Sequence, residues 1–219
     1  MKLSLPLSQL ATYLSIQLQH FYPDAHDMKM IVDICLPTVI ERLDLCFSHI
    51  HKKYYRIAHE SVFNHLNGDH YAMFLYMMAN EAYRKQYIPL AEKCFLLNKA
   101  LHGIDAFYSI ELPEIFLFVH PVGTVLGNAE YQNYFVVYQN VTVGSDLKGI
   151  YPRFGEGVVL YAKSSVIGEC HLGHNISIAA HAFVRNKTIS DNQIVFGVHP
   201  NEIVKSHARN NILDFFKGC

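Results

Sequence analysis

The sequence has little charge and almost no imbalance between its positive and negative residues. Of its 219 residues 17% are charged, the formal net charge is −1 and the isoelectric point is about 6.9. A chain without a basic surplus exerts no long-range pull on nucleic acid or on an anionic membrane, so neither is expected as a partner. Its 51% apolar residues predict one or two packed domains rather than a disordered or fibrous chain.

The chain also lacks the marks of a secreted, disulfide-bonded or membrane-spanning protein. Its five cysteines are odd in number and contain no CxxC pair, which is typical of reduced thiols. They are Cys35, Cys46, Cys94, Cys170 and Cys219. The start of the chain has no sustained apolar run or cleavage site, and stretches such as 71–79 fall far short of the ~20 residues that cross a bilayer. We therefore expect a cytoplasmic protein.

Histidine is abundant but scattered. None of the spacings among the 14 histidines resembles a zinc site, so no metal is expected. His171, His174 and His181 are expected to be surface or corner residues.

The first half of the sequence has apolar residues at helical spacing. Leu10, Leu14 and Leu18 predict a first helix that ends near residues 22–24. A second helical stretch covers about 31–47, with Pro37 inside it as an expected kink or break. Two more are expected over about 71–84 and 89–101, so residues 1–104 are interpreted as a helical domain.

Beyond residue 105 the period changes to six. Counting by six from Phe154, every position up to Val184 is apolar. The intervening members are Leu160, Val166, Leu172 and Ile178. Leu126, Val137 and Val143 lie close to the same spacing upstream, displaced by an insertion over about 145–153.

A six-residue period predicts a β-helix, in which each hexapeptide supplies a short strand and a turn and three of them complete one coil. The aliphatic residue points inward, and the residue two before it is expected to be small. An ordinary β-sandwich with coincidental spacing is the alternative. The expected architecture is α+β: a helical domain at 1–104, a left-handed parallel β-helix at 105–205 and a tail at 206–219.

From His120 to Val204 the sequence resembles the serine acetyltransferases, within the hexapeptide-repeat acyltransferase family. The run 120–127, HPVGTVLG, resembles that family's catalytic-histidine segment, and 138–144, YQNVTVG, resembles its Gln-x-Val-Thr-Leu-Gly strand. The run 196–200, FGVHP, stands where the family has Gly-Val-Pro. The resemblance implies acetyl-CoA as co-substrate and a homotrimer or a dimer of trimers.

The resemblance assigns His120 as general base, because an imidazole can take the acceptor's proton at neutral pH. Asp105, fifteen residues upstream, stands where the family has the aspartate that orients this histidine. A linker or capping role for Asp105 is the alternative. Glu111 and Glu114 are nearby rivals for the orienting carboxylate.

Coenzyme A in this family lies along the β-helix between subunits. The positions that match its binding residues are Gly144, Ser145, Tyr161, Ala162 and Ala180. Tyr161 departs from the family's glycine there and is expected to narrow the cleft. Lys205 is a candidate phosphate contact, with an ordinary solvated lysine as the alternative.

The residues that would hold serine differ from the family. Val119 replaces the acidic residue before the catalytic histidine, and Ile150-Tyr151 replaces an Arg-His pair that grips the substrate carboxylate. Neither supplies a charge. The expected reaction is therefore serine O-acetyltransferase-like acetyl transfer to a hydroxyl or amine of a small metabolite, with Tyr151 contacting it. Serine or another small amino acid stays open as the acceptor. A sugar or nucleotide-sugar acceptor is one alternative, and a non-catalytic β-helix that binds a partner through its Phe-rich tail is another.

Overall fold

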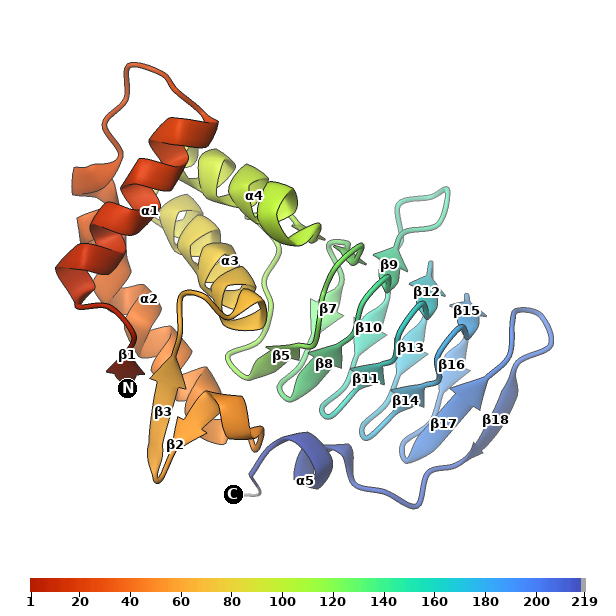
Figure 1. Cartoon of the computed structure of the whole chain (residues 1–219). Coiled ribbons are helices and arrows are strands. Elements are labelled where there is room, and N and C mark those ends of the chain that lie inside the picture. The colour runs from red at the N-terminus through yellow and green to blue at the C-terminus, as the bar shows by residue number, and fades with distance from the viewer. Residues whose placement is uncertain (218–219) are drawn as a thin grey trace.

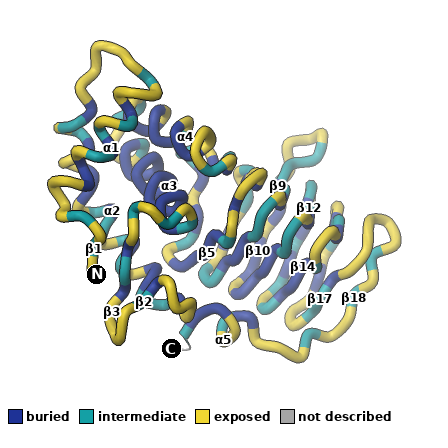
Figure 2. The backbone as a smooth tube through the Cα atoms, in the orientation of Figure 1, coloured by how far each residue is buried: buried dark blue, intermediate teal, exposed yellow. Residues whose placement is uncertain are grey.

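The structure, a computed structural model, describes residues 1–217. Its N-terminal part is built on four helices, of which α3 is the most buried and packs against α2 and α4 (Figures 1 and 2). They are α1 (Leu7–Phe21), α2 (Lys29–His49), α3 (Gly68–Arg84) and α4 (Ile88–His102). A small sheet and a 3-10 turn, which the sequence did not predict, complete this part. They are β1 (Lys2–Leu3), η1 (Lys53–Tyr55), β2 (Arg56–Ile57) and β3 (Glu60–Phe63), in the sheet order β1-β3-β2.

The helix ends follow local chemistry, and α2 continues through Pro37. The side chain of Asn67 caps α3 by accepting hydrogen bonds from two backbone N–H groups, and Gly103, at φ 64°, ends α4. Of the kink or break expected at Pro37, the break is absent, because α2 is one continuous helix through it. Leu36 and Val39 are buried in the core, and this packing holds the helix across the missing N–H.

Residues 105–206 form a parallel β-helix of the left-handed type, as predicted, with three sheets as the sides of a prism (Figure 1). Side 1 contains β4 (Asp105–Ala106), β6 (Val125–Leu126), β9 (Thr142–Gly144), β12 (Ser165–Ile167) and β15 (Phe183–Arg185). Side 2 contains β5 (Phe116–Phe118), β8 (Phe135–Val137), β11 (Val159–Leu160), β14 (Ser177–Ile178), β17 (Gln193–Phe196) and the antiparallel β18 (Ile203–Ser206). Side 3 contains β7 (Glu130–Tyr131), β10 (Arg153–Phe154), β13 (His171–Leu172) and β16 (Thr188–Ile189).

The predicted six-residue register is confirmed. All six apolar positions from Phe154 to Val184 are at most 4% exposed. Leu160 lies opposite Val137 and Ile178 in the neighbouring coils, so these side chains stack inside the prism. The positions two before the stack are also buried, yet they hold large residues as well as small ones. They include Val158 and Ile176 beside Ser164, Cys170 and Ala182.

After β18 the chain runs back along side 2 to the helical part. The short helix α5 (Asn211–Phe215) lies there, and the Asn211 side chain donates hydrogen bonds to two carbonyls of the β-helix. Phe215 and Phe216 are buried, and Phe216 forms a bridge with Ile50. The Phe-rich tail, which in one alternative would bind a partner, packs on its own chain. Cys219 lies outside the described residues. Within residues 1–217 no helix has the length and apolar character that a membrane span requires.

Candidate functional site

His120 lies at the turn that leads from side 2 to side 1 in the first coil. Eight positions separate Phe118 from Leu126 there, whereas six separate Val137 from Val143, the residues paired with them in the next coil. The two extra residues push the turn outward, and the His120 side chain is 78% exposed. The backbone of His120 is left-handed, with φ 49°.

Gly123, not His120, takes the corner position that Asn140 and Lys163 fill in later coils. All three have positive φ and stand three residues before the paired strand residues Leu126, Val143 and Val166. A Cβ on Gly123 would come within 2.4 Å of the Asn140 side-chain oxygen, which would then have to shift. His120 consequently has no counterpart in the coils below.

A carboxylate from the helical part meets this turn. The backbone N–H of His120 donates a hydrogen bond to Oδ1 of Asp69 at 3.1 Å, and the other carboxylate oxygen lies 3.7 Å from His120 Nδ1. Burial raises the pKa of Asp69, while the His120 N–H and ring oppose that shift. Sequence reasoning missed Asp69. The one available signal was its place after the helix-breaking Asn67-Gly68.

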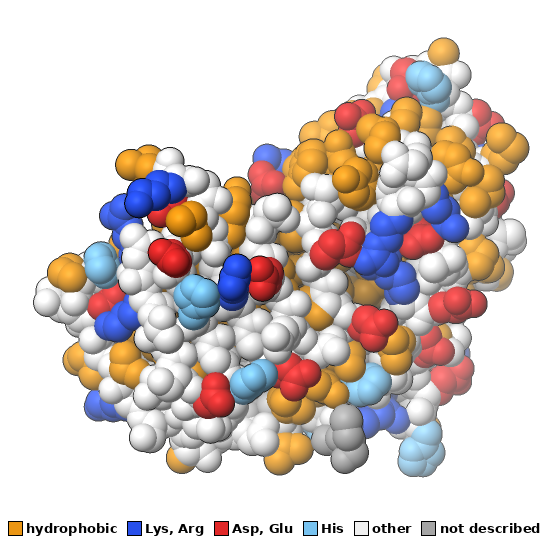
Figure 3. Space-filling model, turned by 180° about the vertical axis from the view of Figure 1, so that it is seen from behind, with side chains coloured by type: hydrophobic (Ala, Val, Ile, Leu, Met, Phe, Trp, Pro, Cys, Tyr) orange, Lys and Arg blue, Asp and Glu red, His pale blue; other side chains and the backbone are white. Residues whose placement is uncertain are grey.

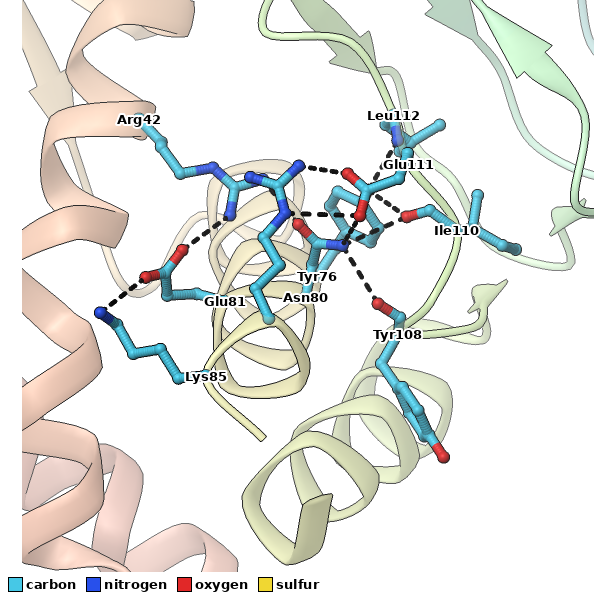
Figure 4. Close-up of polar contacts among 10 residues, drawn as sticks. Arg42, Tyr76, Asn80, Glu81, Lys85, Tyr108, Ile110, Glu111 and Leu112 are labelled. Atoms are coloured by element: carbon cyan, nitrogen blue, oxygen red, sulfur yellow. Dashed lines mark hydrogen bonds and ion pairs between the residues drawn. The ribbon is translucent and has the colours of Figure 1, made fainter. Parts of the chain in front are cut away.

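The carboxylates that the sequence proposed for this role have other partners. Asp105 Oδ2 lies 2.6 Å from Lys99 Nζ. Glu111 pairs with Arg84 in a network that ties α2 and α3 to the segment before β5, shown in Figure 4. Glu114 precedes β5, whereas His120 follows it, so the two lie at opposite ends of that strand. The structure brings Asp69, and not these three, into contact with His120.

Two of the proposed coenzyme A residues form a strip of small side chains below His120. Ala162 and Ala180 occupy equivalent places in consecutive coils, two residues after the paired Leu160 and Ile178. Neither alanine is buried. Their methyl side chains add little bulk along this corner.

The side chain of Tyr161, which replaces the family's glycine, packs against other aromatic rings. Its ring stacks on Tyr138 with centroids 5.2 Å apart, and Tyr138 in turn contacts Phe215 of α5 edge-on. Burial raises the pKa of the Tyr161 hydroxyl. The tail therefore bounds this end of the strip.

The remaining proposed cofactor residues lie elsewhere on the prism. Gly144 ends β9 on side 1, and Ser145 begins the insertion that follows. The Asp146 side chain folds this insertion by accepting two backbone N–H groups, which lower the pKa of its carboxyl. Lys205, on β18 in the last coil of side 2, has its Nζ 6.0 Å from the centroid of the Phe196 ring.

Tyr151 ends the insertion at a different corner, between sides 1 and 3. Its ring packs on Gly127, where an added Cβ would come within 2.5 Å of the ring. It lines a groove of about 300 Å³ that also contains Arg153 and Glu130, whose charged groups are 3.1 Å apart. The strands of side 1 separate this corner from that of His120, so one chain does not bring Tyr151 and His120 together.

Comparisons of the sequence and of the fold with known proteins find serine acetyltransferases. The chain is 27% identical over 143 residues to a serine acetyltransferase of Staphylococcus xylosus, and 26% identical over 147 residues to one of Synechococcus elongatus. These matches cover 64% and 65% of this chain and only 65% and 60% of the relatives. The chain is similar to serine acetyltransferases. No family model matches the chain.

Solved serine acetyltransferases share the fold. The enzyme of Neisseria gonorrhoeae superposes with a TM-score of 0.71 at 21% identity, covering 94% of this chain and 80% of that one. A serine acetyltransferase in complex with CoA gives a TM-score of 0.71 at 16% identity, covering 92% and 85%. The resemblance read from the sequence, and the expected order of a helical part and a β-helix, are both confirmed.

Proposed function

We propose that the chain is an acetyl-CoA-dependent acetyltransferase acting on a hydroxyl or amine of a small metabolite, with His120 as general base. The observation that carries this proposal is the exposed His120 imidazole, held beside a carboxylate on a bulged turn of a serine acetyltransferase-like β-helix. The imidazole would take the acceptor's proton as the new bond to the acetyl carbon forms. Relatives named serine acetyltransferase support the reaction class.

The corner below His120 fits the co-substrate. Acetyl-CoA supplies the thioester whose acetyl group is transferred. The small side chains of Ala162 and Ala180 would let an extended ligand approach the backbone, with Tyr161 beside them. Gly144 and Ser145, at the end of β9 and the corner between sides 1 and 3, would contribute from a neighbouring copy. Among residues 1–217 no three His, Cys, Asp or Glu side chains converge as a metal site, and the proposal uses none.

Serine is the first acceptor to test, because the relatives are named for it and one solved neighbour is in complex with serine. The groove beside Tyr151 favours a second candidate, a sugar or related polyol. Tyr151 offers a hydroxyl where the family has a cation. Arg153, which lines this groove, is already paired with Glu130.

Assembly is part of the proposal. Because His120 and Tyr151 lie at different corners, a complete acceptor site needs His120 from one copy and the Tyr151 groove from another. A cyclic homotrimer meets this need, and two trimers joined through their helical parts would form a hexamer.

The test is turnover of acetyl-CoA, followed by thiol release, with serine, homoserine and amino sugars as acceptors. His120→Ala should lower kcat by about 10² to 10⁴ and leave acetyl-CoA affinity nearly unchanged, because other groups hold the thioester. His59→Ala, an exposed histidine in the turn between β2 and β3, is the matched control and should keep wild-type activity. Loss of acetyl-CoA binding with kcat retained would give His120 a binding role instead.

A further inference from the structure

The turn that holds His120 needs an anchor from outside the β-helix. In the later coils the corner N–H groups donate to carbonyls of the coil above, as Lys163 does to Gln139 at 2.9 Å and His181 to Ala162 at 3.0 Å. In the first coil Gly123 makes the equivalent bond, to the carbonyl of Gly103 at 3.0 Å. His120 lies in the two-residue extension that the later coils lack, and its N–H donates to Asp69 Oδ1.

The backbone of Asp69 is held in place by its own helix, independently of His120. It lies in the first turn of α3, and its own N–H is bound by the Asn67 side chain, which caps that helix. The Asp69 carboxylate is therefore not needed to cap α3, and it faces the first coil of the β-helix. The side chain is 22% exposed, against 78% for His120, so a partly buried anchor holds an exposed ring. The positive end of the α3 dipole favours a negative charge at this place.

The two carboxylate oxygens of Asp69 lie near two different atoms of His120. Oδ1 accepts the backbone N–H and so fixes the left-handed residue. Oδ2 faces Nδ1 at 3.7 Å, which is an ion-pair distance rather than a hydrogen bond. Contacts of this kind commonly shorten when substrate binds. A proton held on Nδ1 leaves Nε2 with its lone pair free.

We infer that Asp69 is the positioning residue for His120, selecting the Nδ1–H tautomer and stabilising the imidazolium that forms when Nε2 takes the acceptor's proton. The inference rests on the proposed function for its catalytic consequence. It assigns the role to a helix of the N-terminal part, and not to Asp105 in the first strand of the β-helix. Asp69 itself touches no reacting atom.

A purely structural anchor is the competing explanation, and one substitution separates the two. Asp69→Asn keeps an oxygen that can accept the His120 N–H, so the turn should stay anchored. It removes the negative charge and offers an N–H₂ group toward Nδ1, which favours the wrong tautomer. Asp69→Ala removes both functions. Asp105→Asn is the matched control, since it changes the rival carboxylate by the same atoms.

The expected result is a fall in kcat of roughly 10- to 100-fold for Asp69→Asn, with the KM for acetyl-CoA within twofold of wild type and an unchanged melting temperature. Asp105→Asn should stay within about threefold in kcat. Asp69→Glu should recover part of the lost activity, because it restores the charge. Wild-type kcat in Asp69→Asn, or a large loss in Asp105→Asn alone, would overturn the assignment.

A second measurement does not depend on activity. In protein labelled with ¹⁵N-histidine, long-range ¹H–¹⁵N spectra report which ring nitrogen carries the proton, and His120→Asn identifies the His120 signals. Wild type should show His120 with its proton on Nδ1, and Asp69→Asn should shift the population toward Nε2–H. An unchanged tautomer would refute the positioning role even if the protein transfers acetyl groups. If Asp69→Asn shifts the His120 tautomer but the wild-type protein has no transferase activity, the positioning role of Asp69 stands. Only the proposed function is then refuted.

Discussion

His70 shows how burial alone can make one side chain sensitive to pH. It is 0% exposed, and its ring lies within 5 Å of the rings of Phe47 and Tyr55. Nδ1 accepts the N–H of Asn64, while Nε2 has no hydrogen-bond partner within the described part of the chain. Burial lowers the pKa of His70 to about 4.

We predict that acid destabilises the protein through His70. Its folded pKa lies below the unfolded value of about 6.5, so its contribution is fully present above pH 6.5 and is lost as pH falls toward 4. Between pH 7 and pH 5 the loss should be about 2 kcal/mol in the free energy of unfolding. Denaturant unfolding at pH 7 and pH 5 measures how the free energy of unfolding changes with pH.

The control for this prediction compares slopes rather than absolute stability. His70→Gln should reduce the pH dependence by that amount, although it also loses packing. His181→Gln, at an exposed corner, should leave the dependence as it is in wild type. Equal slopes in wild type and His70→Gln would show that the buried imidazole is protonated without cost.

At the scale of the element, the strands of the β-helix are too short to be stable alone. Most contain two or three residues, so each depends on the stack formed with the coils on either side. Leu172 in β13 is 4% exposed and lies between Phe154 and Ile189 of the adjacent coils. A charge at this position would have no partner inside the prism.

Leu172→Asp should therefore lower the free energy of unfolding by several kcal/mol, because it buries an unpaired carboxylate. Thr188→Asp is the matched control, since Thr188 is exposed on the next strand of the same side and should change stability by less than about 0.5 kcal/mol. Thermal melts measure both. A Leu172→Asp protein with the melting temperature of wild type would contradict the register of the β-helix.

At the scale of the whole molecule, the helical part presents apolar side chains to solvent. From behind, hydrophobic side chains gather over this part of the surface, with charged groups between them (Figure 3). Ile16 on α1 is 64% exposed, and Met30 and Ile34 on α2 are 71% and 47% exposed. Exposed apolar groups of this kind suit an interface between copies of the chain.

We expect a trimer or a pair of trimers in solution, with light scattering giving three or six times the 25.1 kDa chain mass. If the helical part joins trimers, the double variant Ile16→Glu with Met30→Glu should yield trimers that keep acetyl transfer. The exposed Ile57→Glu on β2 serves as the control and should leave the assembly unchanged. A stable, active monomer would remove the shared-site proposal.

Several parts of this architecture could be predicted from sequence because they depend on local periodicity. The spacing of Leu10, Leu14 and Leu18 located α1, and the six-residue apolar register located the strands from Phe154 onward. At Pro37 the sequence allowed either a kink or a break in α2, and tertiary packing keeps the helix continuous there. The small sheet and α5 were missed because their strands and helix are short and their partners lie far away in the chain.

The sequence by itself determined the β-helix, its insertion and the identity of His120 as the candidate base, because each is written in residues close together in the chain. Only the tertiary structure decided which carboxylate meets that histidine. Asp69 and His120 are 51 residues apart, and their contact depends on how α3 docks against the first coil. The same is true of the tail, whose phenylalanines are buried by Ile50 and side 2 and not by a partner. A repeat fixes its own register through nearest neighbours, whereas a contact between two domains is set by packing that no local pattern encodes.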